Sequence, residues 1–280
     1  SKVITPPDNG LIRNYFTSSI DPTGNFTGSA GNPLLVPASA KQFDASLEWY
    51  FAQVGSLTLN GFYKEIENFF YQEVRQDVIT NGSGDTRPVT VRGPANFDGT
   101  GKVKGFEVAY QQTFDFLPSP LDGFGVQANY TYIDSEGLPN SFLNAGEVPN
   151  NSTVAPSGNL PLEQLSKHNY NVAGFYEKGP LSVRAAYNWR SRFLLTAADV
   201  IFPYYSIFNE PTGQLDASIF INVSDAFDIP GGIRIGVQGV NLLNEVTRTS
   251  QAYTGDPDRL APRSYFMNDR RFSFIIRGNF

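Results

Sequence analysis

The 280-residue sequence contains no cysteine, one histidine and one methionine. Without cysteine, the chain has neither a disulfide framework nor a thiolate metal site. His168 is the only histidine, which excludes a histidine-rich metal centre. A single histidine at the start of a strand is more often structural than catalytic. We therefore expect no metal and no cofactor.

Clustered positive charge and long apolar runs are also missing. The formal net charge is −6, whereas a nucleic-acid surface requires clustered lysine and arginine. No apolar run approaches the roughly 18 residues of a membrane helix. A transmembrane barrel stays open to consideration, because its strands carry only a weak alternating signal. We expect no nucleic-acid partner.

Motifs for covalent chemistry are absent as well. The sequence has no Gly-x-Ser-x-Gly elbow, no phosphate-binding loop and no histidine-based triad. We therefore predict no catalytic residues and no enzymatic activity.

The residues that are abundant indicate an all-β chain. Tyrosine and phenylalanine number 14 and 23, and glycine and proline number 26 and 19. Aromatic residues at alternate positions, separated by turn residues, are typical of strands. Nine segments alternate in this way: 43–51, 57–63, 106–114, 124–132, 169–176, 181–190, 215–223, 233–238 and 270–280. We predict nine strands, each with an apolar and a polar face.

The connections between these segments alternate in length. Short turns lie near 53–56, 117–123, 178–180 and 225–231, and long polar connections near 78–101, 136–166, 197–213 and 244–263. Transmembrane barrels have short periplasmic turns and long extracellular loops, whereas a soluble sandwich has no reason for this alternation. Aromatic residues near strand ends, such as Trp189 and Tyr132, suit an interfacial girdle. The pattern favours a membrane barrel over a soluble all-β protein.

Several motifs, in order along the chain, resemble the C-terminal part of TonB-dependent outer-membrane receptors. The segment 31–37 (Gly-Asn-Pro-Leu-Leu-Val-Pro) resembles the family's Gly-Asn-Pro-x-Leu-x-Pro segment, and 57–70 resembles the strand that follows. The pieces around 105–107 and 123–132 resemble the next hairpin. Val240 to Asn244 resembles the family's Asn-Leu-Phe/Leu-Asn element near the end of the barrel.

The resemblance implies an antiparallel transmembrane β-barrel of 22 strands preceded by a plug domain. The Gly-Asn-Pro segment would introduce strand 14, so nine C-terminal strands are expected, as the alternation also predicts. Residues 1–40 would form an extracellular loop region and residues 41–280 the C-terminal portion of the barrel. Nine strands cannot close such a barrel, and no plug or energy-coupling box is present. The chain is therefore expected to be a fragment or a part of a longer receptor.

The last strand resembles the signal that the barrel-assembly machinery reads. Phe272, Phe274 and Ile276 share one face of this strand, and Phe280 ends the chain. Strand addition to an open edge is a known mode of recognition. We expect these residues to face lipid and to act in assembly.

The function implied by the resemblance is TonB-dependent uptake of a scarce nutrient across the outer membrane of a Gram-negative bacterium. The sequence looks most like the branch associated with plant or algal carbohydrates, so a carbohydrate is the first expectation for the ligand. Candidate ligand residues, chosen by position, are Arg190, Arg192, Tyr204 and Tyr205. The alternatives are uptake of a ferric siderophore, a passive porin and a soluble all-β carbohydrate-binding protein. Expected partners are outer-membrane lipid, the TonB complex and the remainder of the same barrel.

Overall fold

A computed structural model describes residues 1–14, 16–20, 26–80, 82–138, 160–197, 205–228, 232–253 and 258–278. These residues form strands β1 to β18, the short helices α1 (Asn9–Ile12) and α2 (Val223–Phe227), and the 3-10 helix η1 (Leu121–Gly123). None of the helices in this part of the chain is long and apolar enough to cross a membrane. The predicted all-β class is confirmed.

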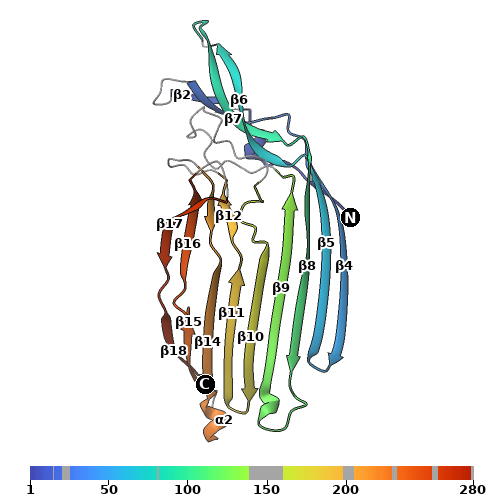
Figure 1. Cartoon of the computed structure of the whole chain (residues 1–280), viewed down its shortest axis with the longest axis vertical. Helices are drawn as coiled ribbons and strands as arrows, with labels where there is room; N and C mark the ends of the chain where they lie inside the picture. The colour runs from blue at the N-terminus through green and yellow to red at the C-terminus, as the bar shows by residue number, and fades with distance from the viewer. Residues whose placement is uncertain are drawn as a thin grey trace.

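One tall antiparallel sheet dominates the molecule (Figure 1). Its strands, in spatial order, are β1 (Lys2–Thr5), β4 (Ala38–Ala52), β5 (Gly55–Glu67), β8 (Thr100–Thr113), β9 (Phe124–Glu136), β10 (His168–Lys178), β11 (Leu181–Arg190), β14 (Thr212–Asn222), β15 (Arg234–Val240) and β18 (Arg271–Arg277). The nine predicted strands are all present, and β1 adds a short tenth. The sheet is open, because β1 and β18 lie at opposite edges.

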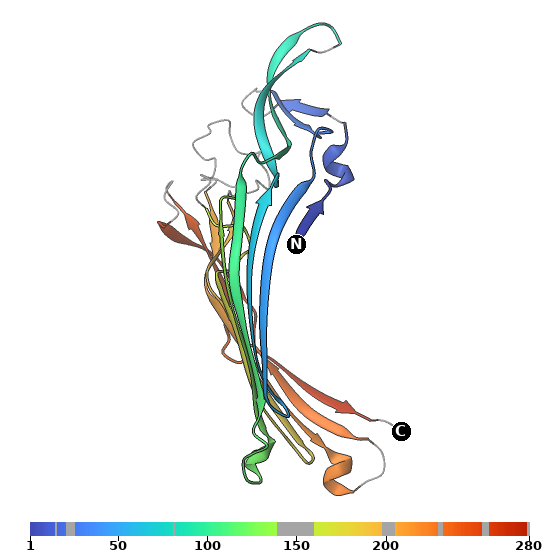
Figure 2. The ribbon, with the colours of Figure 1, turned by 90° about the vertical axis from the view of Figure 1, so that its right-hand side faces the viewer.

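The two faces of this sheet differ as the alternation predicts. Figure 2 shows that the sheet is bowed, with both ends of the chain on one side of it. Large apolar side chains such as Phe43 and Phe274 are exposed on one face, at 70% and 69%. The opposite face carries polar side chains that line shallow cavities. In a bowed sheet, side chains converge on the concave side, where they can enclose cavities. Because the cavities are lined by the polar side chains, the polar face is the concave one.

A second, four-stranded sheet continues the wall beyond the long-connection end. It contains β12 (Phe193–Thr196), β13 (Ile207–Asn209), β16 (Val246–Ala252) and β17 (Leu260–Met267) in that order. Leu194, Ala197 and Phe208 form its small buried core, with Leu160 and Leu260 packed against it. We call this sheet the upper sheet.

A third sheet stands farther out at the same end (Figure 1). It contains β2 (Phe16–Ile20), β3 (Phe26–Ala30), β7 (Thr86–Asn96) and β6 (Phe70–Thr80). Ala30, Val89 and Val91 form its core. The β3–β7 pair is parallel, and it involves only Thr90 to Arg92 of β7.

Two parts of the chain differ from the sequence prediction of loops at 1–40 and 78–101. The first 40 residues contain β1, α1, β2 and β3, and the connection after β5 folds into the β6–β7 hairpin. Pro88 and Pro94 look like turn signals, but they flank the three residues of β7 that pair with β3. Both prolines are paired in register with β6 but lie outside the contact with β3, and proline is found at such edge positions of sheets.

Candidate functional site

A row of amide side chains crosses the concave face near its long-connection end. The strand register places Asn129, Asn171, Asn188 and Gln214 opposite one another on β9, β10, β11 and β14. The adjacent row contains Thr131, Asn169, Arg190 and Thr212. The eight residues of the two rows line a cavity of about 520 Å³, together with Thr247 of the upper sheet. We call this cavity the amide cavity.

Hydrogen bonds fix several of these amides. Asn171 Nδ2 donates to Asn188 Oδ1. Asn169 Nδ2 donates to the carbonyl of Ser166 at 3.1 Å. Gln214 Nε2 donates to both carboxylate oxygens of Asp216, at 2.9 and 3.0 Å. Amides both donate and accept, so the wall offers neutral hydrogen-bonding groups held in fixed positions.

Arg190 supplies the one cationic side chain among the residues that line the amide cavity. Its guanidinium carbon lies 3.8 Å from the centre of the Phe193 ring. Its Nε donates to Ser166 Oγ at 3.2 Å. The stacked ring and the hydroxyl hold the guanidinium at the cavity edge. The sequence identified Arg190 by position alone, and its role in binding stays a prediction.

Arg192 and Tyr205, two of the other predicted ligand residues, do not line this cavity. Arg192 donates from Nε and Nη2 to Glu210 Oε2, at 3.0 and 2.8 Å, so its charge is offset. Tyr205 is partly buried, and its carbonyl accepts from Gln251 Nε2 at 3.4 Å. Tyr204 lies outside the described residues. Their roles stay predictions.

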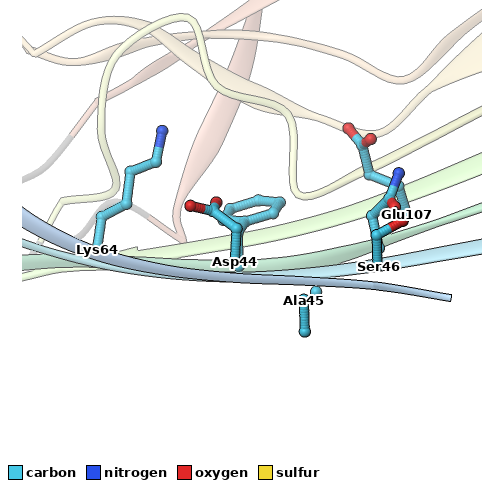
Figure 3. A pocket seen from close by; sticks show the side chains of 8 residues that line it. Asp44, Ala45, Ser46, Lys64 and Glu107 are labelled. Carbon is cyan, nitrogen blue, oxygen red and sulfur yellow. Dashed lines mark hydrogen bonds between the residues drawn. The ribbon is translucent and has the colours of Figure 1, made fainter. Parts of the chain in front are cut away.

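A second, charged cavity of about 490 Å³ lies at the β4–β5–β8 side of the same face. Figure 3 shows Asp44, Lys64 and Glu107 on one side of the strands and Ala45 on the other. Gln42 Nε2 donates to Asp44 at 2.7 Å. Lys64 and Glu107 form no ion pair with any side chain in the described part of the chain. This cavity thus presents both charge signs to the concave side.

Charged pairs also mark the two ends of the sheet. At the long-connection end, Lys167 Nζ donates to Asp134 at 2.9 Å, and this bond raises the pKa of the lysine. At the short-turn end, Lys178 Nζ donates to Asp122, and this bond lowers the pKa of the carboxyl. Both pairs stabilise ionised side chains at the rims.

Three of the residues proposed as an assembly signal lie on the edge strand β18. Phe272, Phe274 and Ile276 are 68%, 69% and 65% exposed on one face. Phe280 lies outside the described residues. The geometry agrees with a lipid-facing strand, while recognition by assembly machinery stays a prediction.

Sequence reasoning missed the amide cavity and the charged cavity. Asn129, Asn171 and Asn188 were on the expected polar faces, and Gln214 lies just before the predicted segment 215–223. The rows also depend on the register between strands that long connections separate. Such a register is not encoded locally. Among the described residues, no group of three or more histidine, aspartate or glutamate side chains is arranged to hold a metal ion.

Solved structures share this fold at low sequence identity. A mutant of the ferric enterobactin receptor PfeA from Pseudomonas aeruginosa, in complex with enterobactin, is 14% identical with a TM-score of 0.65. The siderophore receptor PirA from Acinetobacter baumannii is 12% identical with a TM-score of 0.61. The ferric-catecholate import receptor Fiu from Escherichia coli is 17% identical with a TM-score of 0.54.

The chain corresponds to only part of these receptors. The matches cover 99%, 99% and 98% of this chain but 37%, 38% and 31% of PfeA, PirA and Fiu. No curated protein sequence matches the chain. The family model described as "TonB dependent receptor-like, beta-barrel" matches residues 1–242. With its open antiparallel wall, the chain therefore belongs to the β-barrel family of TonB-dependent receptors.

Proposed function

We propose that the chain forms the C-terminal wall of a receptor that imports a small-molecule nutrient across the Gram-negative outer membrane by TonB-dependent transport. The observation that carries this proposal is the bowed antiparallel sheet with an apolar convex face and a polar concave face. Lipid contacts the convex face and the transport lumen lies on the concave one. The energy comes from the TonB complex, and the chain performs no covalent chemistry.

A ferric siderophore is the ligand class that the comparisons favour. The three similar receptors are described as a ferric enterobactin receptor, a siderophore receptor and a ferric-catecholate receptor. This supports the sequence-based alternative more than the first expectation of a carbohydrate. Arg190, the cation among the described residues of the amide cavity, would contact an anionic ferric complex bound there.

A carbohydrate is the second candidate, and the amide cavity favours it. Asn129, Asn171, Asn188 and Gln214 present neutral donors and acceptors, which suit the hydroxyl groups of sugars. The charge of Arg192 is already offset by Glu210.

Uptake by the intact receptor tests the proposal. A deletion strain and a strain complemented with the full-length gene are given iron-labelled ferric enterobactin or labelled maltohexaose. We expect uptake of one probe to require both the receptor and TonB. Uptake that persists without TonB would identify a passive porin. Recovery of the intact protein in the soluble fraction would refute the proposal that it is an outer-membrane protein.

We also propose two partners for β18. Its free edge would pair with the remainder of the same barrel, and its exposed Phe272, Phe274 and Ile276 would be read by the barrel-assembly machinery. Strand addition at an open edge satisfies backbone groups that otherwise have no partner in the bilayer.

A further inference from the structure

A phenyl ring, that of Phe62, lines the charged cavity on the polar concave face. The strand register places Phe62 of β5 opposite Gly105 of β8. A Cβ atom at residue 105 would lie only 2.6 Å from Phe62 Cζ, so the ring occupies the space that a side chain there would fill. The ring therefore lies along the wall. Because Phe62 is only partly buried, the side of the ring that turns away from β8 is open to the cavity.

Two carboxylates flank this ring. Asp44 of β4 lies opposite Phe62 in the register, and Gln42 Nε2 donates to this carboxylate at 2.7 Å. Glu107 lies two positions beyond Gly105 on β8 and lines the same cavity. Figure 3 shows both carboxylates on the same side of the strands. The cavity therefore has hydrogen-bond acceptors on the β4 side and on the β8 side of the ring.

Hydrogen-bond donors come from β5 itself. Asn60 and Lys64 lie two positions before and two positions after Phe62, and both line the cavity. Ser46 Oγ donates to Asn60 Oδ1 at 2.7 Å, which fixes the amide and leaves its Nδ2 to donate. Lys64 forms no ion pair within the described part of the chain. The ring is thus surrounded by donors as well as acceptors.

This mixture of groups limits the class of ligand that fits the cavity. Two carboxylates, Asp44 and Glu107, against the single ammonium group of Lys64 disfavour an anionic ferric complex. An organic cation would in turn meet that ammonium group beside the ring. Hydroxyl groups both donate and accept, so a neutral polyhydroxylated ligand can bind the carboxylates and the ammonium group alike.

We propose that the charged cavity is a subsite for one neutral pyranose ring of an oligosaccharide, with Phe62 as the surface on which the sugar stacks. The C–H groups on one face of a pyranose carry a small positive charge, which the negative face of an aromatic ring attracts. The cavity volume of about 490 Å³ lies in the range of small-molecule sites. This inference rests on the proposed function, of which it supports the carbohydrate as ligand class.

Binding of oligosaccharides to the purified intact receptor tests the subsite. The probes are maltohexaose, cellohexaose and laminarihexaose, and calorimetry measures their affinities. We expect at least one of them to bind. Phe62→Leu keeps an apolar side chain but removes the aromatic face, so the affinity should fall by about two- to tenfold. Phe62→Tyr keeps the ring and should retain the parent affinity.

Phe175→Leu is the matched control. Phe175 of β10 lies opposite Gly125 of β9, and its ring occupies the space of the missing side chain in the same way as that of Phe62. It lies four positions from Asn171 on the same face of the sheet, but it does not line the charged cavity. This variant removes an equivalent ring from the wall, and the affinity for the oligosaccharide should stay unchanged.

The outcomes separate this inference from transport. Binding of none of the three probes, equal losses in Phe62→Leu and Phe175→Leu, or a loss in Phe62→Tyr as large as in Phe62→Leu would each overturn the subsite. TonB-dependent uptake of ferric enterobactin without oligosaccharide binding would overturn the subsite and leave the proposed transport standing. Oligosaccharide binding that depends on Phe62, without any TonB-dependent uptake, would support the subsite and overturn the proposed transport.

Discussion

The backbone N–H of Asn241 donates a hydrogen bond to Asp216 Oδ1 at 2.9 Å, and this bond joins the segment 241–245, between β15 and β16, to the neighbouring strand β14. Asp216 also accepts from Gln214, which lines the amide cavity. One carboxylate thus connects this segment with the side chains of the candidate site.

Asn241→Ala is expected to destabilise the receptor by about 1–3 kcal/mol, because the hydrogen bonds of this buried side chain to backbone groups of Glu245 and Asn268 are lost. Asn241→Gly loses the same bonds but adopts the φ of 55° freely, so it should be less destabilising by about 1 kcal/mol. Leu243→Ala, at an exposed position of the same segment, is the control. The measurement is denaturant unfolding in detergent micelles. Equal stability of Asn241→Ala and Leu243→Ala would contradict the prediction.

Phe274→Arg is expected to impair membrane assembly, because this exposed side chain lies on the apolar face of β18. Arginine at the lipid face of a barrel costs about 2–4 kcal/mol near the bilayer midplane. Ser273→Arg places the same charge on the opposite face of the same strand and should be tolerated. Heat-modifiable migration on a gel measures the assembled fraction. If both variants assemble equally well, β18 does not face lipid in this orientation.

Lys178→Gln is expected to reduce stability at neutral pH and to have no effect in strong acid. The lysine holds the pKa of Asp122 below its usual value, so this contribution is present above the unfolded pKa of about 3.9. It is lost as the pH falls through the lower folded pKa, when the carboxyl is protonated. Unfolding of both proteins is compared from neutral to strongly acidic pH. Glu177→Gln changes a residue one position away on the other face. Its stability should not approach that of the parent protein as the pH falls.

Asn188→Leu is expected to weaken ligand binding by a few-fold to about tenfold, because one hydrogen bond of about 0.5–1.5 kcal/mol is lost from the lumenal wall. Tyr187→Phe, on the neighbouring outward-facing position, is the matched control. Calorimetry with the transported probe measures the affinity. Equal affinities of the two variants would place the ligand elsewhere in the lumen.

The tall sheet could be predicted from sequence because its strands are long and one face of each is apolar. The segment 43–51, for example, alternates over its whole length and forms part of β4. The upper sheet was not predicted, because strands as short as β13, with three residues, are too brief to show a period. The outermost hairpin was not predicted for another reason: β7 has 11 residues but contains Pro88 and Pro94, and prolines within a segment argue against a strand.

The candidate site was harder to predict than the fold. Arg190 was predicted from its place at the end of an alternating strand. It lines the amide cavity, while its role in binding stays a prediction. Arg192 is two residues further on, and only the three-dimensional structure reveals that Glu210 offsets its charge. The amide row needed the pairing of Asn129 with Asn171, across a connection of more than thirty residues whose length leaves the register undetermined.

The strand order of the tall sheet has a consequence for how the wall folds. From β4 to β18 its strands lie side by side in the same order as along the chain. Each strand can therefore pair with the strand that precedes it in the tall sheet, and no step requires a segment from a distant part of the sequence. The outer sheets are inserted in the connections and can form afterwards. Such sequential growth keeps the loop-closure entropy of each step small, which favours rapid folding.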